Sequence, residues 1–214
     1  MLFSEALEIR PGLTAVMGSG GKTSLVCRLA DELSAARVII ATSTHMRQVP
    51  ALQARVGTVA PGTPAIVGTP CGDGKFGPPE QSWAELCALA DYVLVEADGS
   101  RRLPLKAHAP HEPVIPANAQ RVVLVVGADG FGKPIRDVCH RSEHYAALCG
   151  VSENALVTPE LEAALILAEG LGDRVYINKV ETAEDYDRAA ALANRLTCPV
   201  TAGSLHKGVY LCLR

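Results

Sequence analysis

Short apolar runs alternate along the chain with stretches of helical periodicity. Residues 13–17 form an apolar run that ends at Gly18, and residues 23–35 then place Leu and Val side chains at helical spacing. The same criteria predict two further helices, over 82–90 and 183–196. Other apolar runs predict strands over 38–41, 65–67, 92–95, 122–126 and 175–177, and edge strands over 200–201 and 209–213.

The alternation of strands with helices of about 10–15 residues predicts an α/β fold. In this class a mainly parallel sheet is covered by helices on both faces, which gives a three-layer sandwich. A length of 214 residues fits a single domain over 1–214. Ligands of such folds bind beyond the carboxyl ends of the strands, so the residues that follow each predicted strand are the candidates for chemistry.

Two stretches interrupt the alternation. Residues 57–79 contain 11 Gly or Pro among 23 residues, and four prolines punctuate the segment from 98 to 118. Such a density of Gly and Pro predicts irregular loop regions near 57–79 and 98–118. Long loops in compact domains often act as functional lids, but inert surface insertions have the same composition, and both interpretations stay open.

Charge and composition narrow the function classes. The chain has 20 Lys and Arg against 23 Asp and Glu, a formal net charge of −3, which argues against a nucleic-acid binder. No apolar run approaches the roughly 18 residues that span a bilayer, and Glu5, Glu8 and Arg10 interrupt any signal-peptide core. Seven cysteines without a C-x-x-C pair predict neither a disulfide framework nor a zinc ribbon. We therefore expect a soluble, cytoplasmic protein without membrane association. The sequence does not indicate its oligomeric state.

The strongest candidate site is a glycine-rich segment between the first predicted strand and helix. Residues without Cβ let backbone N–H groups approach phosphates, and a helix N-terminus favours an anion. Lys22 would contact the β- and γ-phosphates and Thr23 would supply a hydroxyl for Mg²⁺. The pattern predicts nucleotide-binding residues at Gly18, Ser19, Gly20, Gly21, Lys22, Thr23 and Ser24.

This segment departs from the standard phosphate-binding loop. The pattern G-x-x-x-x-G-K-[ST] would place its first glycine at position 16, which is Val16. The shorter form G-x-G-G-K-T resembles the loop of the Mur ligase group. The alternative interpretation is a glycine-rich turn with an exposed lysine. The strand–loop–helix context favours the phosphate loop and hence a P-loop NTPase-like fold.

Two carboxylates follow the predicted strand over 92–95. In P-loop NTPases an acid at this strand end binds the metal or orients the attacking water. Glu96 follows the apolar run directly and is the metal-side candidate together with Thr23, whereas Asp98 is a candidate metal contact or general base. The predicted catalytic residues are Lys22, Glu96 and Asp98. Solvated loop acids remain the alternative.

A third candidate site follows the predicted strand over 175–177. Asn178, Lys179 and Glu181 form Asn-Lys-x-Glu, close to the Asn-Lys-x-Asp with which guanine-specific GTPases read the base. Glu181 carries the same charge one methylene further out, and residues 201–204 stand where a GTPase has its second base-contacting loop. The three residues are predicted nucleotide contacts with GTP or ATP as ligand, and a solvated polar strand end is the alternative.

Other polar residues offer weaker signals. Thr44 and His45 follow the second strand, where they are candidate switch residues or simply turn caps. His140 and His144 have the i, i+4 spacing of a metal pair, but Arg141 between them favours an ordinary polar helix face. In the proline-rich segment, which also contains His108, the candidate substrate contacts are Arg101, Lys106, His111 and Glu112.

A long run joins several of these motifs into a resemblance. Residues 95–107 read VEADGSRRLPLKA and residues 111–116 read HEPVIP. Together with the phosphate loop, Thr44-His45-Met46, the residues 126–130 and Asn178-Lys179, this run resembles the YqeC family. His108 and Glu181 depart from what the family commonly has, and the second departure weakens any preference for GTP.

The resemblance implies a small P-loop NTPase that acts as an accessory protein of selenium-dependent molybdenum hydroxylases. Its partner would then be a molybdenum hydroxylase or a cofactor-maturation protein. The function expected from the sequence is Mg²⁺-dependent binding and hydrolysis of GTP or ATP as a step in that maturation. The alternatives are a Mur-like ligase or small-molecule kinase, and a nucleotide-gated cofactor-binding module with negligible turnover.

Overall fold

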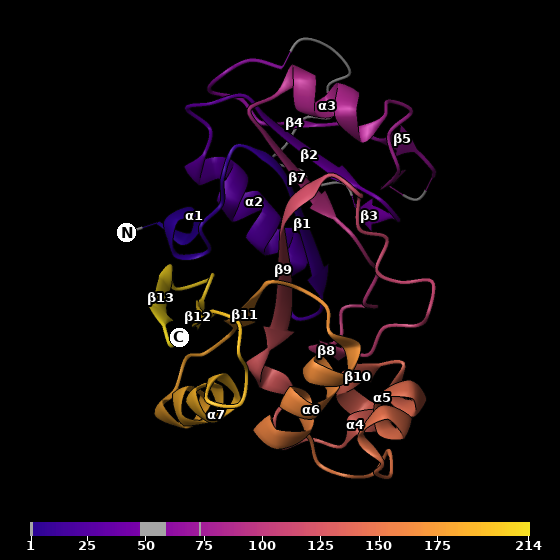
Figure 1. Cartoon of the computed structure of the whole chain (residues 1–214), viewed down its shortest axis with the longest axis vertical. Coiled ribbons are helices and arrows are strands. Elements are labelled where there is room, and N and C mark those ends of the chain that lie inside the picture. Colours follow the sequence, from indigo (N-terminus) through magenta and orange to yellow (C-terminus); the bar gives the residue numbers. More distant parts are fainter. Residues whose placement is uncertain (1, 48–58, 73) are drawn as a thin grey trace. The chain divides into compact units, whose positions relative to one another are not determined.

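The computed structural model describes residues 2–47, 59–72 and 74–214. The chain forms two compact units that are discontinuous in sequence (Figure 1). The first unit consists of Met1–Met17, Lys22–Gly99 and Pro113–Val122. The second consists of Gly18–Gly21, Ser100–Glu112 and Val123–Arg214.

The first unit is built on a run of parallel strands. Their order is β1 (Gly12–Gly18), β7 (Tyr92–Glu96), β2 (Val38–Thr42) and β4 (Ala65–Ile66). Leu13 and Ile39 both pair with Val93, which defines the register of the three longer strands. Each of these four strands confirms a strand predicted from an apolar run.

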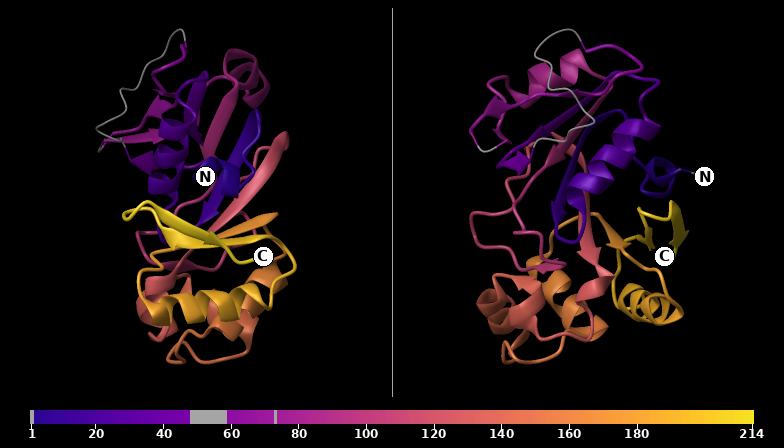
Figure 2. Two further views of the ribbon diagram at one scale, coloured as in Figure 1. Left: turned by 90° about the vertical axis from the view of Figure 1, so that its left-hand side faces the viewer. Right: turned by 180° about the vertical axis from the view of Figure 1, so that it is seen from behind.

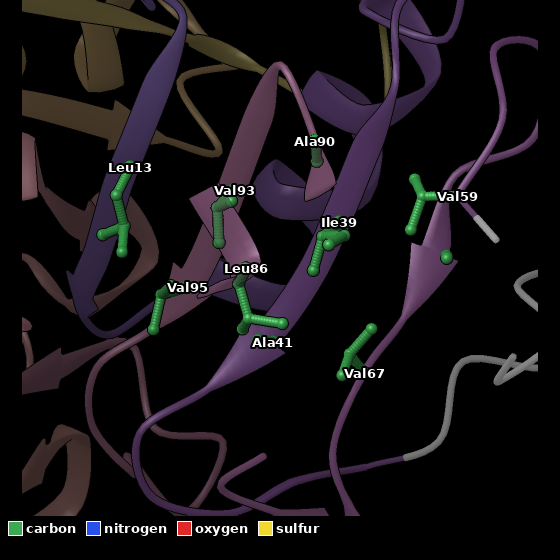
Figure 3. Packing of buried hydrophobic residues seen from close by; sticks show 10 residues of the cluster. Leu13, Ile39, Ala41, Val59, Val67, Leu86, Ala90, Val93 and Val95 are labelled. Atoms are coloured by element: carbon green, nitrogen blue, oxygen red, sulfur yellow. The ribbon is translucent and has the colours of Figure 1, made fainter. Parts of the chain in front are cut away.

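The helices of this unit are α1 (Phe3–Ala6), α2 (Lys22–Glu32) and α3 (Trp83–Leu89). Of these, α2 and α3 pack on the strands and α1 packs on α2. The helix α3 begins at a capping box in which Ser82 and Glu85 satisfy each other's backbone N–H groups. Its Leu86 packs on the sheet face that carries Val93 and Val95, whereas α2 lies behind the strands in the view of Figure 3. Both α2 and α3 confirm predicted helices.

A small antiparallel sheet occupies the glycine- and proline-rich stretch. It consists of β3 (Met46–Arg47), β6 (Lys75–Gly77) and β5 (Thr69–Pro70). Residues 57–79 were expected to be irregular apart from a short strand near 65–67, yet β5 and β6 form here because their backbones pair with each other. Residues 57, 58 and 73 of that stretch lie outside the described residues.

The second unit has its own run of strands. Their order is β9 (Ala119–Gly127), β11 (Arg174–Asn178), β12 (Val200–Ser204) and β13 (Val209–Cys212). The first three are parallel and β13 is antiparallel to β12. All four confirm predicted strands. The expectation that 200–201 lies at an edge is wrong, because β11 and β13 flank β12 on either side.

Helices and two short strands complete the second unit. The elements are η1 (Ala128–Gly130), α4 (Ile135–Val138), α5 (Ser142–Cys149), α6 (Pro159–Glu169), α7 (Ala183–Ala193), β8 (Leu105–Lys106) and β10 (Cys139–His140). The predicted helix over 183–196 is confirmed as α7, which packs on β12 (Figure 2). The helix face predicted for His140 and His144 is wrong, because His140 lies in β10 and only His144 lies in α5.

These elements establish the fold class. The molecule is α/β, with eight strands in a mainly parallel sheet and helices flanking it, as in a P-loop NTPase-like sandwich. None of the helices formed by the described residues combines the length and apolar character needed to cross a membrane.

Candidate functional site

The glycine-rich segment follows β1 directly and ends where α2 begins at Lys22. Gly18, Gly20 and Gly21 have φ angles of +92°, +83° and +137°, which side-chain-bearing residues rarely adopt. A Cβ on Gly18 would collide with the Val125 carbonyl oxygen, and one on Gly21 would collide with the Asn178 side chain. The glycines are therefore required both by backbone conformation and by close packing.

Ser19 and Ser24 have different environments. The Ser19 backbone N–H donates to the Val125 carbonyl oxygen at 2.8 Å, and its hydroxyl donates to the Leu103 carbonyl oxygen. Ser19 is buried, whereas Ser24 is exposed on the first turn of α2. Ser19 thus ties the loop to the start of the proline-rich segment within the second unit.

Lys22 forms a buried ion pair in the first unit. Its Nζ lies 3.1 Å from Asp98 Oδ1, and the two side chains are 3% and 0% exposed. Removing two charges from water costs several kcal/mol per ion, and the close approach of the ammonium and the carboxylate offsets part of that cost. The structure therefore joins the first residue of α2 to the acid two positions beyond β7.

Thr23 and Glu96 form a second contact between the same two elements. The Thr23 hydroxyl donates to Glu96 Oε2 at 2.8 Å. Burial raises the pKa of Glu96, while the Lys22 ammonium and the Thr23 hydrogen bond oppose that shift and Asp98 adds to it. The Glu96 carbonyl oxygen accepts from the Thr42 hydroxyl and the Ser43 N–H, both at 3.0 Å, which fixes the strand end.

The donor set of this cluster suits Mg²⁺. Hydroxyl and carboxylate oxygens are hard ligands, and Mg²⁺ typically takes one or two of them from the protein and the remainder from phosphates and water. Thr23 and Glu96 would supply these oxygens, and Asp98 lies close enough to Lys22 to act beside them. Within the described part of the chain, no three His, Cys, Asp or Glu side chains gather as a metal-binding group of their own.

The two switch candidates lie at the end of β2. The Thr44 N–H donates to the Thr42 hydroxyl at 3.1 Å, which places Thr44 next to the strand end that holds Glu96. The Thr44 hydroxyl oxygen is buried and has no hydrogen-bond partner among the described residues. His45 is exposed, and its ring lies 4.0 Å from where a Cβ on Gly77 would stand. Thr44 is therefore the candidate that belongs with the acidic cluster.

Asn178 connects the glycine segment with the end of β12 in the second unit. Its Nδ2 donates to the Gly20 carbonyl oxygen at 2.8 Å. Its Oδ1 accepts from the Leu205 N–H at 3.2 Å and from the Tyr176 hydroxyl at 3.3 Å. The amide is thus engaged at both ends, which assigns Asn178 a positioning role for the loop.

Lys179 and Glu181 are more exposed. Lys179 has a φ of +64°, and its Nζ lies 2.7 Å from Asp129 Oδ2, a residue of η1 that was not among the predicted site residues. The Ser204 hydroxyl donates to Glu181 Oε1 at 2.7 Å and lowers the pKa of Glu181. Ser204 belongs to the stretch 201–204 expected as a second base-contacting loop, so these strand ends of the second unit do meet.

The proline-rich segment contributes a separate charged cluster. Lys106 Nζ lies 2.8 Å from Glu112 Oε2, and Arg141 Nη2 lies 3.0 Å from the same oxygen. Arg101 is exposed with a φ of +48°, and His111 is exposed as well. The sequence indicated Arg141 only as a charge that would repel a metal. Its contact with Glu112 could not be predicted, because it depends on the pairing of β10 with β8 in the fold.

His108 belongs to a different network. Its Nδ1 lies 2.7 Å from Glu169 Oε2, and its backbone N–H donates to the other oxygen of the same carboxylate at 2.6 Å. Both side chains are almost fully buried. His108 therefore fastens the proline-rich segment to α6.

Two comparisons with known proteins agree with each other. The family model described as YqeC protein matches residues 14–143. A relative from Escherichia coli (strain K12), named "Uncharacterized protein YqeC", is 33% identical over 163 residues, which is 68% of this chain and 64% of the relative. The match thus spans less than two thirds of the relative's own length. The family match includes the glycine segment, Glu96, Asp98 and Lys106, and the chain belongs to the YqeC family.

Proposed function

We propose that this chain binds and hydrolyses a nucleoside triphosphate in a Mg²⁺-dependent reaction. The observation that carries the proposal is the pairing of Lys22 with Asp98 and of Thr23 with Glu96. These pairs place one ammonium, one hydroxyl and two carboxylates at the start of the helix that follows a glycine segment. Phosphoryl transfer needs this combination of cation, metal ligand and acid, because its catalysis is mainly positioning and charge stabilisation.

Lys22 would exchange partners when a triphosphate binds. Its ammonium is neutralised by Asp98, and phosphate oxygens offer the same kind of negative charge. Moving Lys22 to the β- and γ-phosphates would let the Asp98 carboxylate accept a proton from water or orient it. The N–H groups of the glycine segment and the N-terminus of α2 would stabilise the negative charge of the phosphates.

Thr23 and Glu96 would hold Mg²⁺, which supplies charge neutralisation on the triphosphate when bound. The Thr23 hydroxyl already lies against Glu96, so both oxygens face the same position. Burial raises the pKa of Glu96, and a bound cation would favour the ionised carboxylate. Metal binding and deprotonation of Glu96 would therefore support each other.

The strand ends of the second unit would read the base. Asn178 holds the loop through Gly20, and Lys179 and Glu181 follow it. The Glu181 carboxylate would accept hydrogen bonds from guanine, whereas adenine would leave it facing another acceptor. An unsatisfied polar group costs about 1–3 kcal/mol, which corresponds to about 5- to 150-fold in affinity, so we expect GTP to bind more tightly than ATP.

The test measures GTP and ATP affinity with and without Mg²⁺, followed by phosphate release. Lys22→Ala should abolish tight triphosphate binding, whereas Arg28→Ala, which removes another cation from α2, should leave it unchanged. Unchanged binding in a folded Lys22→Ala variant would overturn the proposal. Binding without turnover would favour the nucleotide-gated module, and turnover that appears only with an added acceptor would favour the ligase or kinase.

The base preference has its own variant. Glu181→Ala should make the GTP and ATP affinities equal while retaining triphosphate binding, since Glu181 is exposed and its carboxylate contacts Ser204 and Lys207. Lys207→Ala is the matched control, because it removes the neighbouring cation and leaves the carboxylate. An unmodified protein that binds ATP as tightly as GTP would contradict the base assignment without affecting the phosphate site.

The proposed biological role is an accessory step in maturation of a selenium-dependent molybdenum hydroxylase in the cytoplasm. This role rests on membership of the YqeC family and on the resemblance of the run over 95–116. Its partner would be the hydroxylase or a protein that matures its cofactor. The test is activation of purified, inactive hydroxylase by the chain with a triphosphate. Activation that proceeds equally with the Lys22→Ala variant would separate the role from nucleotide chemistry.

A further inference from the structure

Two cations share one carboxylate oxygen in the cluster around Glu112. Lys106 and Arg141 approach the same Glu112 oxygen at 2.8 Å and 3.0 Å, and Arg141 Nε adds a hydrogen bond at 3.3 Å. The Lys106 side chain is 0% exposed. Although burial raises the pKa of Glu112, Lys106 and Arg141 hold it below its usual value, so the carboxylate is ionised at neutral pH.

Arg101 and His140 extend this cluster. His140 pairs with Lys106 in the β8–β10 ladder. Burial and, after it, the charges of Lys106, Arg141 and Arg101 lower the pKa of His140 to about 4, and Glu112 offsets only part of this shift. The neutral His140 imidazole thus lies in the field of Lys106, Arg141 and Arg101, which Glu112 offsets only in part. A positive field at this position favours binding of an anion.

The segment that carries Arg101 and Lys106 is attached to the glycine loop. The Ser19 hydroxyl donates to the Leu103 carbonyl oxygen, and the Gly127 N–H donates to the Pro104 carbonyl oxygen at 3.0 Å. A Cβ on Gly20 would stand 2.9 Å from that same Pro104 oxygen. All these residues belong to the second unit. The cluster is therefore linked to the loop through a segment of a few residues.

We propose that the cluster formed by Arg101, Lys106, His140 and Arg141 binds an anionic group, phosphate or carboxylate, of a second small-molecule substrate. Glu112 occupies the position of that group by presenting its own carboxylate to the same donors. An incoming anion displaces Glu112 and receives the charge-assisted hydrogen bonds that Glu112 now accepts. That this substrate takes part in a nucleotide reaction rests on the proposed function, whereas anion binding by the cluster does not.

The experiment follows the His140 imidazole by nuclear magnetic resonance while an anion is added. The probes are inorganic phosphate for the phosphate arm and malonate for the carboxylate arm. A saturable shift of the His140 signals is expected, together with a rise of its pKa, because a bound anion offsets the cations that lower it. A His140→Gln variant identifies the signals. The anion whose response saturates at the lower concentration, phosphate or malonate, identifies the chemistry of the substrate.

Matched variants separate binding at the cluster from a general charge effect. Arg101→Ala should lower the affinity for the anion about 2- to 5-fold, as the loss of one exposed charge does. Arg102→Ala is the control, because Arg102 is the exposed neighbour, shares a positive φ, and is not among the groups that shift His140. Equal weakening by both variants, or no saturable response of His140, would overturn the proposal.

Glu112→Gln tests the displacement directly. The neutral amide no longer competes for Lys106 and Arg141, so anion affinity should rise by about tenfold. If Glu112 only stabilises the fold, the variant should instead be less stable with no gain in anion affinity, and that result would overturn the proposal. If nucleotide binding fails while His140 still responds to the anion, the proposed function is wrong and the anion site is supported. If the nucleotide binds while His140 does not respond, the anion site is wrong and the proposed function is unaffected.

Discussion

Two lysine–aspartate pairs of this molecule have similar chemistry and opposite surroundings. In the first unit, Lys22 lies 3.1 Å from Asp98 with side chains 3% and 0% exposed. In the second unit, Lys179 lies 2.7 Å from Asp129 with side chains 44% and 39% exposed. Both lysines follow a predicted strand and both belong to candidate nucleotide-binding segments. Distance alone would rank the exposed pair as the stronger one.

Burial reverses that ranking. Water and salt screen an exposed pair, which contributes about 0–1 kcal/mol. A buried pair holds two charges whose hydration has been lost, so removing one partner leaves the other charge uncompensated. A phosphate could replace Asp98 beside Lys22 because it carries the same sign of charge. Of the two lysines, we therefore expect Lys22 to matter more for stability and for the proposed phosphate binding.

The largest effect is expected at Lys22. Lys22→Ala should lower the free energy of unfolding by about 3–5 kcal/mol, because it leaves Asp98 buried and charged. Urea unfolding with linear extrapolation measures this change. The double variant Lys22→Ala/Asp98→Ala should recover part of the loss, since Asp98 no longer leaves a buried charge, whereas Glu96 still lacks the Lys22 cation. A Lys22→Ala variant as stable as the unmodified protein would show that the pair is not buried in solution.

Glu162 is a second buried acid, and its hydrogen-bond donor is a hydroxyl rather than the lysine that pairs with Asp98. It tests how burial affects stability when no lysine neutralises the carboxylate. It accepts the Tyr145 hydroxyl at 2.9 Å, with His108, Glu169, Cys139 and Cys149 around this network. Burial, together with a smaller effect of the Glu169 charge, raises the pKa of Glu162 to about 7, although Tyr145 and His108 act in the opposite direction.

The sign of the pH dependence follows from this raised pKa. Between pH 4.5 and about 7 the folded state keeps a proton that the unfolded state has released, so stability should fall as pH rises across this window. The total loss is about 3 kcal/mol. Glu162→Gln should flatten this part of the profile and stabilise the protein at pH 8. Urea unfolding at pH 5 and pH 8 measures both slopes, and an unchanged slope in the variant would exclude Glu162 as its source.

Glu96 sharpens the comparison through turnover. Glu96→Gln keeps a hydrogen-bond acceptor for Thr23 but removes the charge proposed to hold Mg²⁺. Phosphate release should fall by a factor on the order of 10², as loss of one preorganised polar group does. Since the substitution also removes a carboxyl group whose pKa burial raises, stability above neutral pH should not decrease. Full turnover in this variant would make Glu96 a structural residue.

The sequence predicted the strands of the large sheet but not the short strands β3, β5, β6, β8 and β10, and it predicted only part of the helices. Apolar runs identified β1, β2, β7, β9 and β11 because these strands are buried and their side chains vary little in polarity. The helix α6 was missed because its apolar residues are not confined to one face, with Leu165 and Ile166 buried and Leu167 exposed. Its start at Thr158 followed by proline is a capping signal that would have indicated it.

The candidate site was predictable as a set of residue types and not as contacts. The glycines, Lys22 and Thr23 follow each other in sequence, so their shared loop could be recognised. The pairing of Lys22 with Asp98 depends on β1 and β7 being neighbours, and a single sequence does not specify strand order. Arg141 reaches Glu112 only because β10 pairs with β8, two-residue strands that no periodicity reveals.

The smallest effect is expected at the exposed pair. Lys179→Ala removes the partner of Asp129, but both side chains contact water, so the free energy of unfolding should change by no more than about 1 kcal/mol. High salt should reduce even this change, because screening acts on exposed charges first. Lys179 also has a φ of +64°, so a Lys179→Gly variant should offset part of the loss by relieving backbone strain. Urea unfolding of both variants at low and high salt measures these terms. A loss at Lys179 as large as that at Lys22 would show that proximity, and not burial, governs the two pairs.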